Sequence, residues 1–182
     1  NSIGFACHFD PTQAELNAKA ELIERDSFLW HWHWQVAPTL LNTQSNKEYV
    51  IKYFQLQSAL PEFQVALCVI EVKEGYTFFG MGCHQDITKA QEKSQLEAIA
   101  QLYNFRINRP PSLELEEFLQ IQRHTQLHHF QLSLSLRYRQ FITKWLNSPV
   151  SQRVCTTPTI KITECKWDAE LSGHGLSMKR AQ

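Results

Sequence analysis

The sequence lacks the short motifs that mark the commonest enzyme sites. It contains no GxxxxGKS/T phosphate loop, no GxSxG nucleophile turn and no HExxH metal-binding helix. It also lacks an apolar run long enough to cross a bilayer, and no cleavable signal opens it. Its 18 basic and 18 acidic residues cancel, which argues against a broad surface for nucleic acid or anionic membranes. We therefore expect a cytoplasmic protein with no nucleic-acid or membrane partner.

The cysteines lack any pairing pattern. Their number is odd, and no two of them form a CxxC pair. They are Cys7, Cys68, Cys83, Cys155 and Cys165. This usage indicates reduced thiols in the cytoplasm and not a disulfide framework.

No linker or low-complexity segment divides the chain. Of its 182 residues 43% are hydrophobic, so residues 1–182 are expected to form one domain around one core. The chain opens on Asn1, without a methionine and already inside what looks like a strand. We therefore expect this domain to be incomplete and to be a piece of a longer protein.

One pattern occurs twice in the chain. A shift of 76 residues places Gly4–Asp26 on Gly80–Leu102 and gives eight identities without a gap. In the first copy these are Gly4, Cys7, His8, Asp10, Thr12, Ala14, Glu21 and Ile23. Two copies are too few for a solenoid, which usually needs three or more. They predict a duplicated strand–turn–helix unit, over about residues 1–34 and 76–106, packed around a pseudo-twofold axis.

Each unit is expected to contain an apolar strand that ends at a Cys-His pair, followed by a helix capped by aspartate. In the first copy Asp10 is the cap, Pro11 occupies the first turn and Gln13 stands three residues after the cap. This helix should continue toward Trp30, and its counterpart should span about residues 87–106.

The remaining segments alternate between strand and helix patterns. Strands are expected over 49–56, 64–72, 76–82, 159–165 and 174–180, and helical spacing over 113–146. This order predicts an α+β fold with one mixed or antiparallel sheet covered by helices.

The strongest chemical pattern lies on the first helix. Glu21, Glu24 and Arg25 are spaced i, i+3 and i+4, so they project from nearly the same face. Two carboxylates one turn apart can hold Mg²⁺ together with a nucleotide's phosphates, and the arginine can give a phosphate a forked donor. The alternative is an exposed helix face with an ion pair between Glu21 and Arg25. The aromatic residues that follow, from Phe28 to Trp32, favour a partly buried location.

Other groupings of metal-binding side chains have structural explanations that fit better. Neighbours on a strand point to opposite faces, so the two Cys-His pairs cannot easily converge on zinc. His31 and His33 stand in a tryptophan-rich stretch that favours packing, and His128-His129 falls in the long helical stretch. The Gly80-Met81-Gly82 pair at a strand end is weak evidence for a phosphate loop.

These residues together resemble the YcaO-domain family. The similarity lies in the run from Asn1 to Ala6, in Ala14, and in the segment from Glu21 to Asp26. The second copy resembles a later family segment, from Gly82 through Ala90 to Glu97 and Gln101, and the end from Gly175 to Ala181 is weakly similar to the strand before the family's closing segment.

The resemblance implies ATP- and Mg²⁺-dependent activation of peptide backbone amides. The leading reaction is azoline formation on a ribosomally synthesised precursor peptide, in which a Cys, Ser or Thr side chain attacks the amide. By residue, Glu21 and Glu24 are then metal ligands, Arg25 is a phosphate contact and Gln13 faces the nucleotide. The implied partners are the precursor peptide and a leader-binding E1-like or TfuA-like protein, and a homodimer is an open alternative.

The sequence departs from the family pattern at several points. Gln13 stands where the family has a glutamate, Phe9 where it often has asparagine, and Ala100 where it has glutamine or glutamate. An earlier acidic repeat has no counterpart in these residues. The competing hypothesis is therefore a degenerate, non-catalytic scaffold that binds a peptide or a partner subunit.

Overall fold

The computed structural model describes residues 5–148, 162–164 and 177–181. Its elements are β1 (Phe5–His8), α1 (Pro11–His33), β2 (Thr39–Ser45), β3 (Tyr49–Leu56), β4 (Gln64–Val72), β5 (Thr77–His84), α2 (Ile87–Asn108), α3 (Leu115–Leu119), α4 (Gln126–Ser133), α5 (Leu136–Leu146), β6 (Ile162–Glu164) and β7 (Ser177–Ala181). The remainder of the two last predicted strands lies outside the described residues. Among the described helices, none combines the length and the apolar character needed to span a bilayer.

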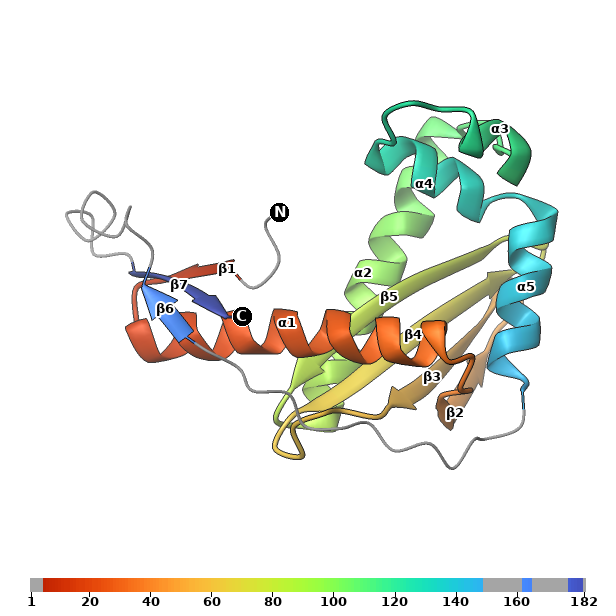
Figure 1. Ribbon diagram of the computed structural model, residues 1–182. Helices are drawn as coiled ribbons and strands as arrows, with labels where there is room; N and C mark the ends of the chain where they lie inside the picture. Colours follow the sequence, from red (N-terminus) through yellow and green to blue (C-terminus); the bar gives the residue numbers. More distant parts are fainter. Residues whose placement is uncertain (1–4, 149–161, 165–176, 182) are drawn as a thin grey trace.

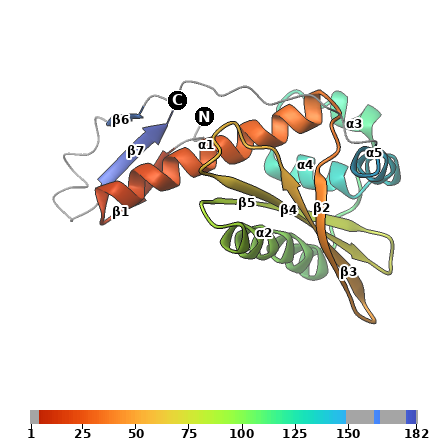
Figure 2. The same ribbon diagram turned by 90° about the horizontal axis from the view of Figure 1, so that it is seen from below.

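The predicted α+β class is confirmed, with an antiparallel four-stranded sheet in the order β2-β3-β4-β5 at its centre. α2 covers one face of this sheet, and the second half of α1 covers the other together with α5 (Figures 1 and 2). The described strands form two sheets, whereas one was expected, because β1 pairs with β7 and β7 with β6. At 23 residues α1 is roughly 34 Å long, enough for its first half to carry the small sheet and its second half the large one.

β4 is buried on both faces, and its side chains alternate between two hydrophobic cores, one on each side of the sheet. Val65, Leu67 and Val69 belong to the core under α1 and α5, which also contains Trp145. Cys68, Ile70 and Val72 belong to the core under α2. Because both faces are apolar, the strand is a nearly continuous apolar run in the sequence, and its predicted bounds are confirmed.

The contact between α2 and β5 is unusually close. Small residues Ala90, Ser94 and Ala98 form the buried face of the helix, and Gly80 and Gly82 lie opposite them. A Cβ atom on Gly80 would lie 2.0 Å from the Ser94 carbonyl oxygen, and one on Gly82 would lie 2.2 Å from that of Ala90. The helix can therefore approach the strand only because both positions are glycine.

The two strand–turn–helix segments share the same turn. His8 Nδ1 accepts a hydrogen bond from Asp10 N–H at 3.0 Å, and Asp10 Oδ1 accepts one from Thr12 N–H at 2.9 Å. In the second copy the same two bonds measure 2.9 Å at the His84–Asp86 pair and 2.8 Å at the Asp86–Thr88 pair. The repeated histidines therefore position the helix caps, and within the described residues no group of three or more metal-binding side chains exists.

Replacing Gly82 with alanine should destabilise the fold by more than about 2 kcal/mol, because the new Cβ must push α2 away from β5. Gly75 is the matched control, since it lies in a turn at φ +82° and its replacement by alanine should cost only about 1 kcal/mol. Urea unfolding followed by circular dichroism measures both variants. If both variants lost the same free energy of unfolding, the close contact between α2 and β5 would not require glycine at position 82.

Candidate functional site

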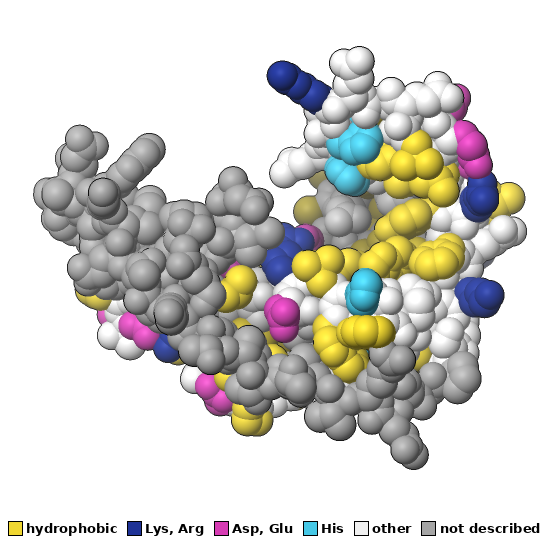
Figure 3. All heavy atoms as spheres, viewed as in Figure 1, with side chains coloured by type: hydrophobic (Ala, Val, Ile, Leu, Met, Phe, Trp, Pro, Cys, Tyr) yellow, Lys and Arg dark blue, Asp and Glu magenta, His cyan; other side chains and the backbone are white. Residues whose placement is uncertain are grey.

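The acidic segment of α1 lies near the outer edge of β5 and the adjoining side of α2. Ala20 and Ile23 anchor this part of α1 in the core that contains Cys83. Glu24, the residue after Ile23, is mostly buried. Its carboxylate interacts electrostatically with Glu97 and Lys93 on α2. On the face shown in Figure 3, charged side chains of both signs and apolar ones lie along α1.

Three side chains of α2, spaced four residues apart, bond the outer edge of β5. Lys93 Nζ donates to the Cys83 carbonyl oxygen at 3.3 Å. Glu97 Oε2 accepts from Met81 N–H at 2.6 Å, and Gln101 Oε1 accepts from Phe79 N–H at 3.4 Å. These bonds satisfy main-chain groups that an edge strand would otherwise leave open. They also hold the Glu97 carboxylate at the strand edge beside α1.

The electrostatics of Glu24 set this site apart from an ordinary salt-bridged surface. Burial raises the pKa of Glu24 to about 7, and the negative charge of Glu97 adds to that effect. Arg25 and Lys93 lower it, and Glu21 raises it further. The two cations therefore do not compensate for burial and the neighbouring carboxylates. A site with these properties favours the uptake of a proton or a metal cation.

The predicted site residues fall on one row of α1. Gln13, Glu21 and Glu24 lie at intervals of two turns and one turn, and Gln13 Nε2 donates to Asn17 Oδ1 at 3.0 Å within the row. The expected capping role of Gln13 is wrong, since His8 bonds the main chain of the cap residue instead. Gln13 lies roughly 12 Å along the helix from Glu21. Glu21, Glu24 and Arg25 are brought together, and Gln13 extends the same face.

Two residues at this site, Glu97 and Lys93, were not among the predicted site residues. The 76-residue shift places Glu21 on Glu97, so the signal for Glu97 was present in the sequence. It could not be recognised from spacing, because Glu97 has no second acidic residue one turn away on α2. Lys93 had no signal of its own.

Cys68, Cys83 and His31 have structural roles. Burial raises the pKa of Cys68 and Cys83 to about 12, which keeps both thiols protonated and unreactive. His31 is buried, with Nδ1 bonded to the Val36 carbonyl oxygen and Nε2 accepting from Gln57 N–H. Burial lowers the pKa of His31, so it stays neutral and joins the end of α1 to the segment after β3.

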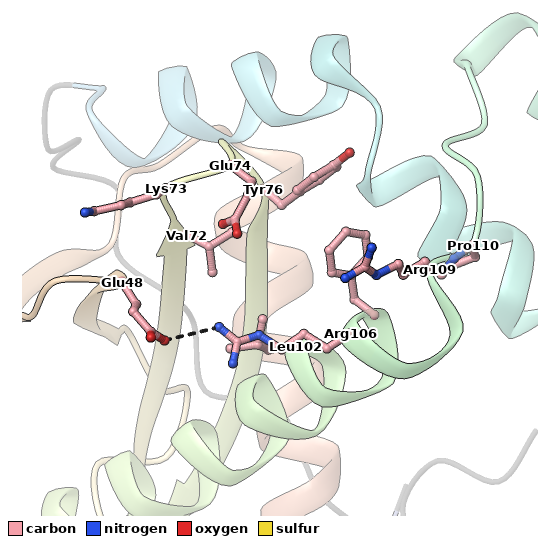
Figure 4. A pocket seen from close by; sticks show the side chains of 10 residues that line it. Glu48, Val72, Lys73, Glu74, Tyr76, Leu102, Arg106, Arg109 and Pro110 are labelled. Atoms are coloured by element: carbon pink, nitrogen blue, oxygen red, sulfur yellow. Dashed lines mark ion pairs between the residues drawn. The ribbon is translucent and has the colours of Figure 1, made fainter.

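A cavity of about 820 Å³ lies elsewhere, at the carboxyl end of α2 and the tips of the two hairpins (Figure 4). Glu48 and Arg106 form an ion pair of 3.5 Å across it, and both side chains are more than half exposed. Leu102, which lines it, lies about 140° around α2 from Glu97. This cavity is therefore separate from the acidic row, and its mixed charges point to no particular ligand.

The donor set of the acidic row fits Mg²⁺. Glu21 and Glu24 offer hard carboxylate oxygens one turn apart, and Mg²⁺ usually takes one or two carboxylates and completes its shell with water and phosphate oxygens. One turn after Glu24, the buried Ser27 hydroxyl has no hydrogen-bond partner among the described residues. Ser27 lies on the same buried face of α1 as Ile23 and His31, so its hydroxyl points to no ligand.

The family model of the YcaO cyclodehydratases, described as ATP- and Mg²⁺-binding, matches residues 1–165. The chain therefore belongs to the YcaO family, and ATP and Mg²⁺ are the cofactors of that family. A comparison with curated protein sequences finds no match.

Solved structures show the same fold at low identity. Escherichia coli microcin synthetase McbBCD, in complex with pro-MccB17, matches with TM-score 0.66 and 15% identity, over 100% of this chain and 53% of that chain. YcaO from Methanopyrus kandleri, bound with AMPPCP and Mg²⁺, matches with TM-score 0.61 and 17% identity, over 100% and 55%. A heterocyclase in complex with substrate and cofactor gives 0.62 and 15%, over 100% and 28%. The chain thus spans about half or less of the length of these structures.

Glu24 should make stability fall as pH rises from about 4.5 to 7, because its folded-state pKa lies above the unfolded value and ionisation favours unfolding. Glu24→Gln should remove this loss and stabilise the chain by about 2 kcal/mol at pH 8. Urea unfolding at pH 5 and pH 8 measures the effect. The control is Glu92→Gln, an exposed change on α2, which should keep the pH dependence of the wild type. If the Glu24→Gln variant also kept it, Glu24 would not be the group that causes the loss of stability.

Proposed function

We propose that this chain supplies part of the Mg²⁺–nucleotide site of an ATP-dependent enzyme that activates peptide backbone amides. The observation that supports it is the mostly buried Glu24 carboxylate, which faces Glu97 with too little positive charge around it. A purely structural contact would be more stable with an uncharged or basic side chain at position 24. The arrangement therefore suits a site that is completed by a cation.

The residues divide into two roles in this proposal. Glu21 and Glu24 would hold Mg²⁺, and Arg25 and Lys93 would contact phosphate oxygens and balance their charge. Gln13, further along the same row, would face the nucleotide. ATP held there would supply the phosphoryl group that turns the amide oxygen into a phosphate leaving group after a Cys, Ser or Thr side chain has attacked.

The reaction we favour is azoline-forming cyclodehydration of a ribosomally synthesised precursor peptide. The supporting finding is that structures similar in fold include a heterocyclase with substrate and the microcin synthetase complex with pro-MccB17. That complex has several subunits, so we also propose that this chain acts with a leader-binding E1-like or TfuA-like partner, or as a homodimer.

A non-catalytic scaffold is the second candidate. Two observations favour it: Ala100 stands on the exposed side of α2, and the described residues contain no group of three metal-binding side chains. A scaffold of this kind would bind a peptide or a partner subunit and would not need nucleotide.

Titration calorimetry of ATP with Mg²⁺ into the chain separates the two candidates. We expect binding in the micromolar range that a Glu21→Gln/Glu24→Gln variant weakens more than tenfold. Affinity should rise roughly tenfold from pH 6 to pH 8, because Glu24 must lose its proton to bind the metal. Glu92→Gln is the control. A folded chain that binds no nucleotide would favour the scaffold.

A further inference from the structure

The two edges of the four-stranded sheet differ in how their main-chain groups are treated. At β5, Lys93, Glu97 and Gln101 bond the groups that point away from the sheet. At the opposite edge, every residue of β2 is exposed. The sheet thus has one edge closed by side chains and one edge open.

The hydrogen-bonding pattern between β2 and β3 shows which main-chain groups of β2 point away from the sheet. Asn46 N–H donates to the Tyr49 carbonyl oxygen and closes the hairpin with β3. Along an antiparallel strand, residues whose N–H and C=O bond the partner strand alternate with residues whose N–H and C=O point away from it. Because Asn46 bonds β3, Gln44 and Asn42 also bond β3. Thr43 and Ser45 therefore direct N–H and C=O outward. The hydrogen bonds of the described residues include none from the outward N–H of either one.

β2 lacks two of the features that usually protect an edge strand, and its one register shift, between Leu40 and Asn42, lies before the regularly paired segment from Thr43 to Ser45. Its seven residues, Thr-Leu-Leu-Asn-Thr-Gln-Ser, include no charge and no proline, which are the common means of preventing edge-to-edge pairing. Leu40 and Leu41 are 54% and 38% exposed. A cavity of about 330 Å³ lies beside the first residue of the strand. Its polar lining consists of the uncharged side chains of Thr39, Gln55, Gln57, Ser58 and Gln64.

We propose that the open edge of β2 docks an extended, uncharged peptide strand by main-chain pairing with Thr43 and Ser45. Strand addition derives its affinity from main-chain hydrogen bonds and its specificity from the side chains beside the edge. Neither the strand nor the cavity offers a charge to pair with, so an acidic or basic peptide side chain would be desolvated without compensation. Hydroxyl, amide and small apolar side chains match the surface.

This docking edge is separate from the acidic row. β2 lies three strand spacings, roughly 14 Å, from β5 across the sheet. A strand bound at β2 would therefore be held away from the proposed nucleotide site. The inference goes beyond the proposed function and does not rest on it, so nucleotide binding and peptide docking can fail independently.

The test uses a terminally blocked peptide of alternating threonine and valine, titrated into the ¹⁵N-labelled full chain. We expect saturable shifts and slower hydrogen exchange at the amides of Thr43 and Ser45. Thr43→Pro removes an outward N–H and no ladder bond, and should weaken binding at least tenfold. Thr43→Val keeps the N–H and should bind like the wild type. A peptide with two glutamates in place of threonines should bind at least fivefold more weakly.

Thr43→Lys, which keeps the backbone and adds a charge at the edge, serves if the proline variant does not fold, and it should also weaken binding. Absence of shifts at Thr43 and Ser45, or unchanged binding by a folded variant of either kind, would overturn the proposal. So would a wild-type dimer in sedimentation that Thr43→Lys dissociates, since the edge would then belong to a second copy of the chain.

Discussion

The close contact between α2 and β5 is the constraint on which the rest of the structure depends. Gly80 and Gly82 have no Cβ, so the backbone of the helix can lie almost on the strand. At that distance Lys93, Glu97 and Gln101 are long enough to reach around the strand and bond its outer edge. The same bonds fix the Glu97 carboxylate where α1 brings Glu24. Packing of small residues therefore determines both the closed edge of the sheet and the charge pattern of the candidate site.

That charge pattern has an electrostatic cost that the fold does not require. The bond from Met81 N–H explains why Glu97 is on α2, because it satisfies a main-chain donor. It does not explain why α1 places a second, mostly buried carboxylate beside it, when an uncharged side chain there would avoid the electrostatic cost. Local conflicts of this kind are characteristic of functional sites, where groups are kept in an unfavourable state until a ligand completes them. Membership of a family described as ATP- and Mg²⁺-binding is consistent with a cation as that ligand.

Much of the fold could be predicted from the sequence, and the failures have physical causes. β3 and β4 were predicted to the residue because burial gives them dense apolar patterns. β2 was missed because an exposed edge strand has no buried face to leave a pattern. Residues 113–146 were expected to be one helical stretch, but capping by Thr125 and Ser135 divides them into separate helices. On α2, Leu96 and Tyr103 are 69% and 65% exposed, whereas Ser94 is buried. Hydrophobicity alone would choose the wrong face of that helix, since the glycines of β5 select small residues.

The internal repeat shows which part of the acidic helix is special. The 76-residue shift places Glu21 on Glu97, and Glu97 has a structural use at the edge of β5, so a glutamate at this shared position needs no catalytic explanation. The same shift places Glu24 on Ala100 and Arg25 on Gln101. The two copies keep the same histidine turn and the same aspartate cap, and differ where the first has an acid–base pair. The second copy needs only an amide there, because Gln101 bonds Phe79 N–H. What the first copy adds to the common framework is Glu24 and Arg25, and a specific function of this chain is best sought in those two residues.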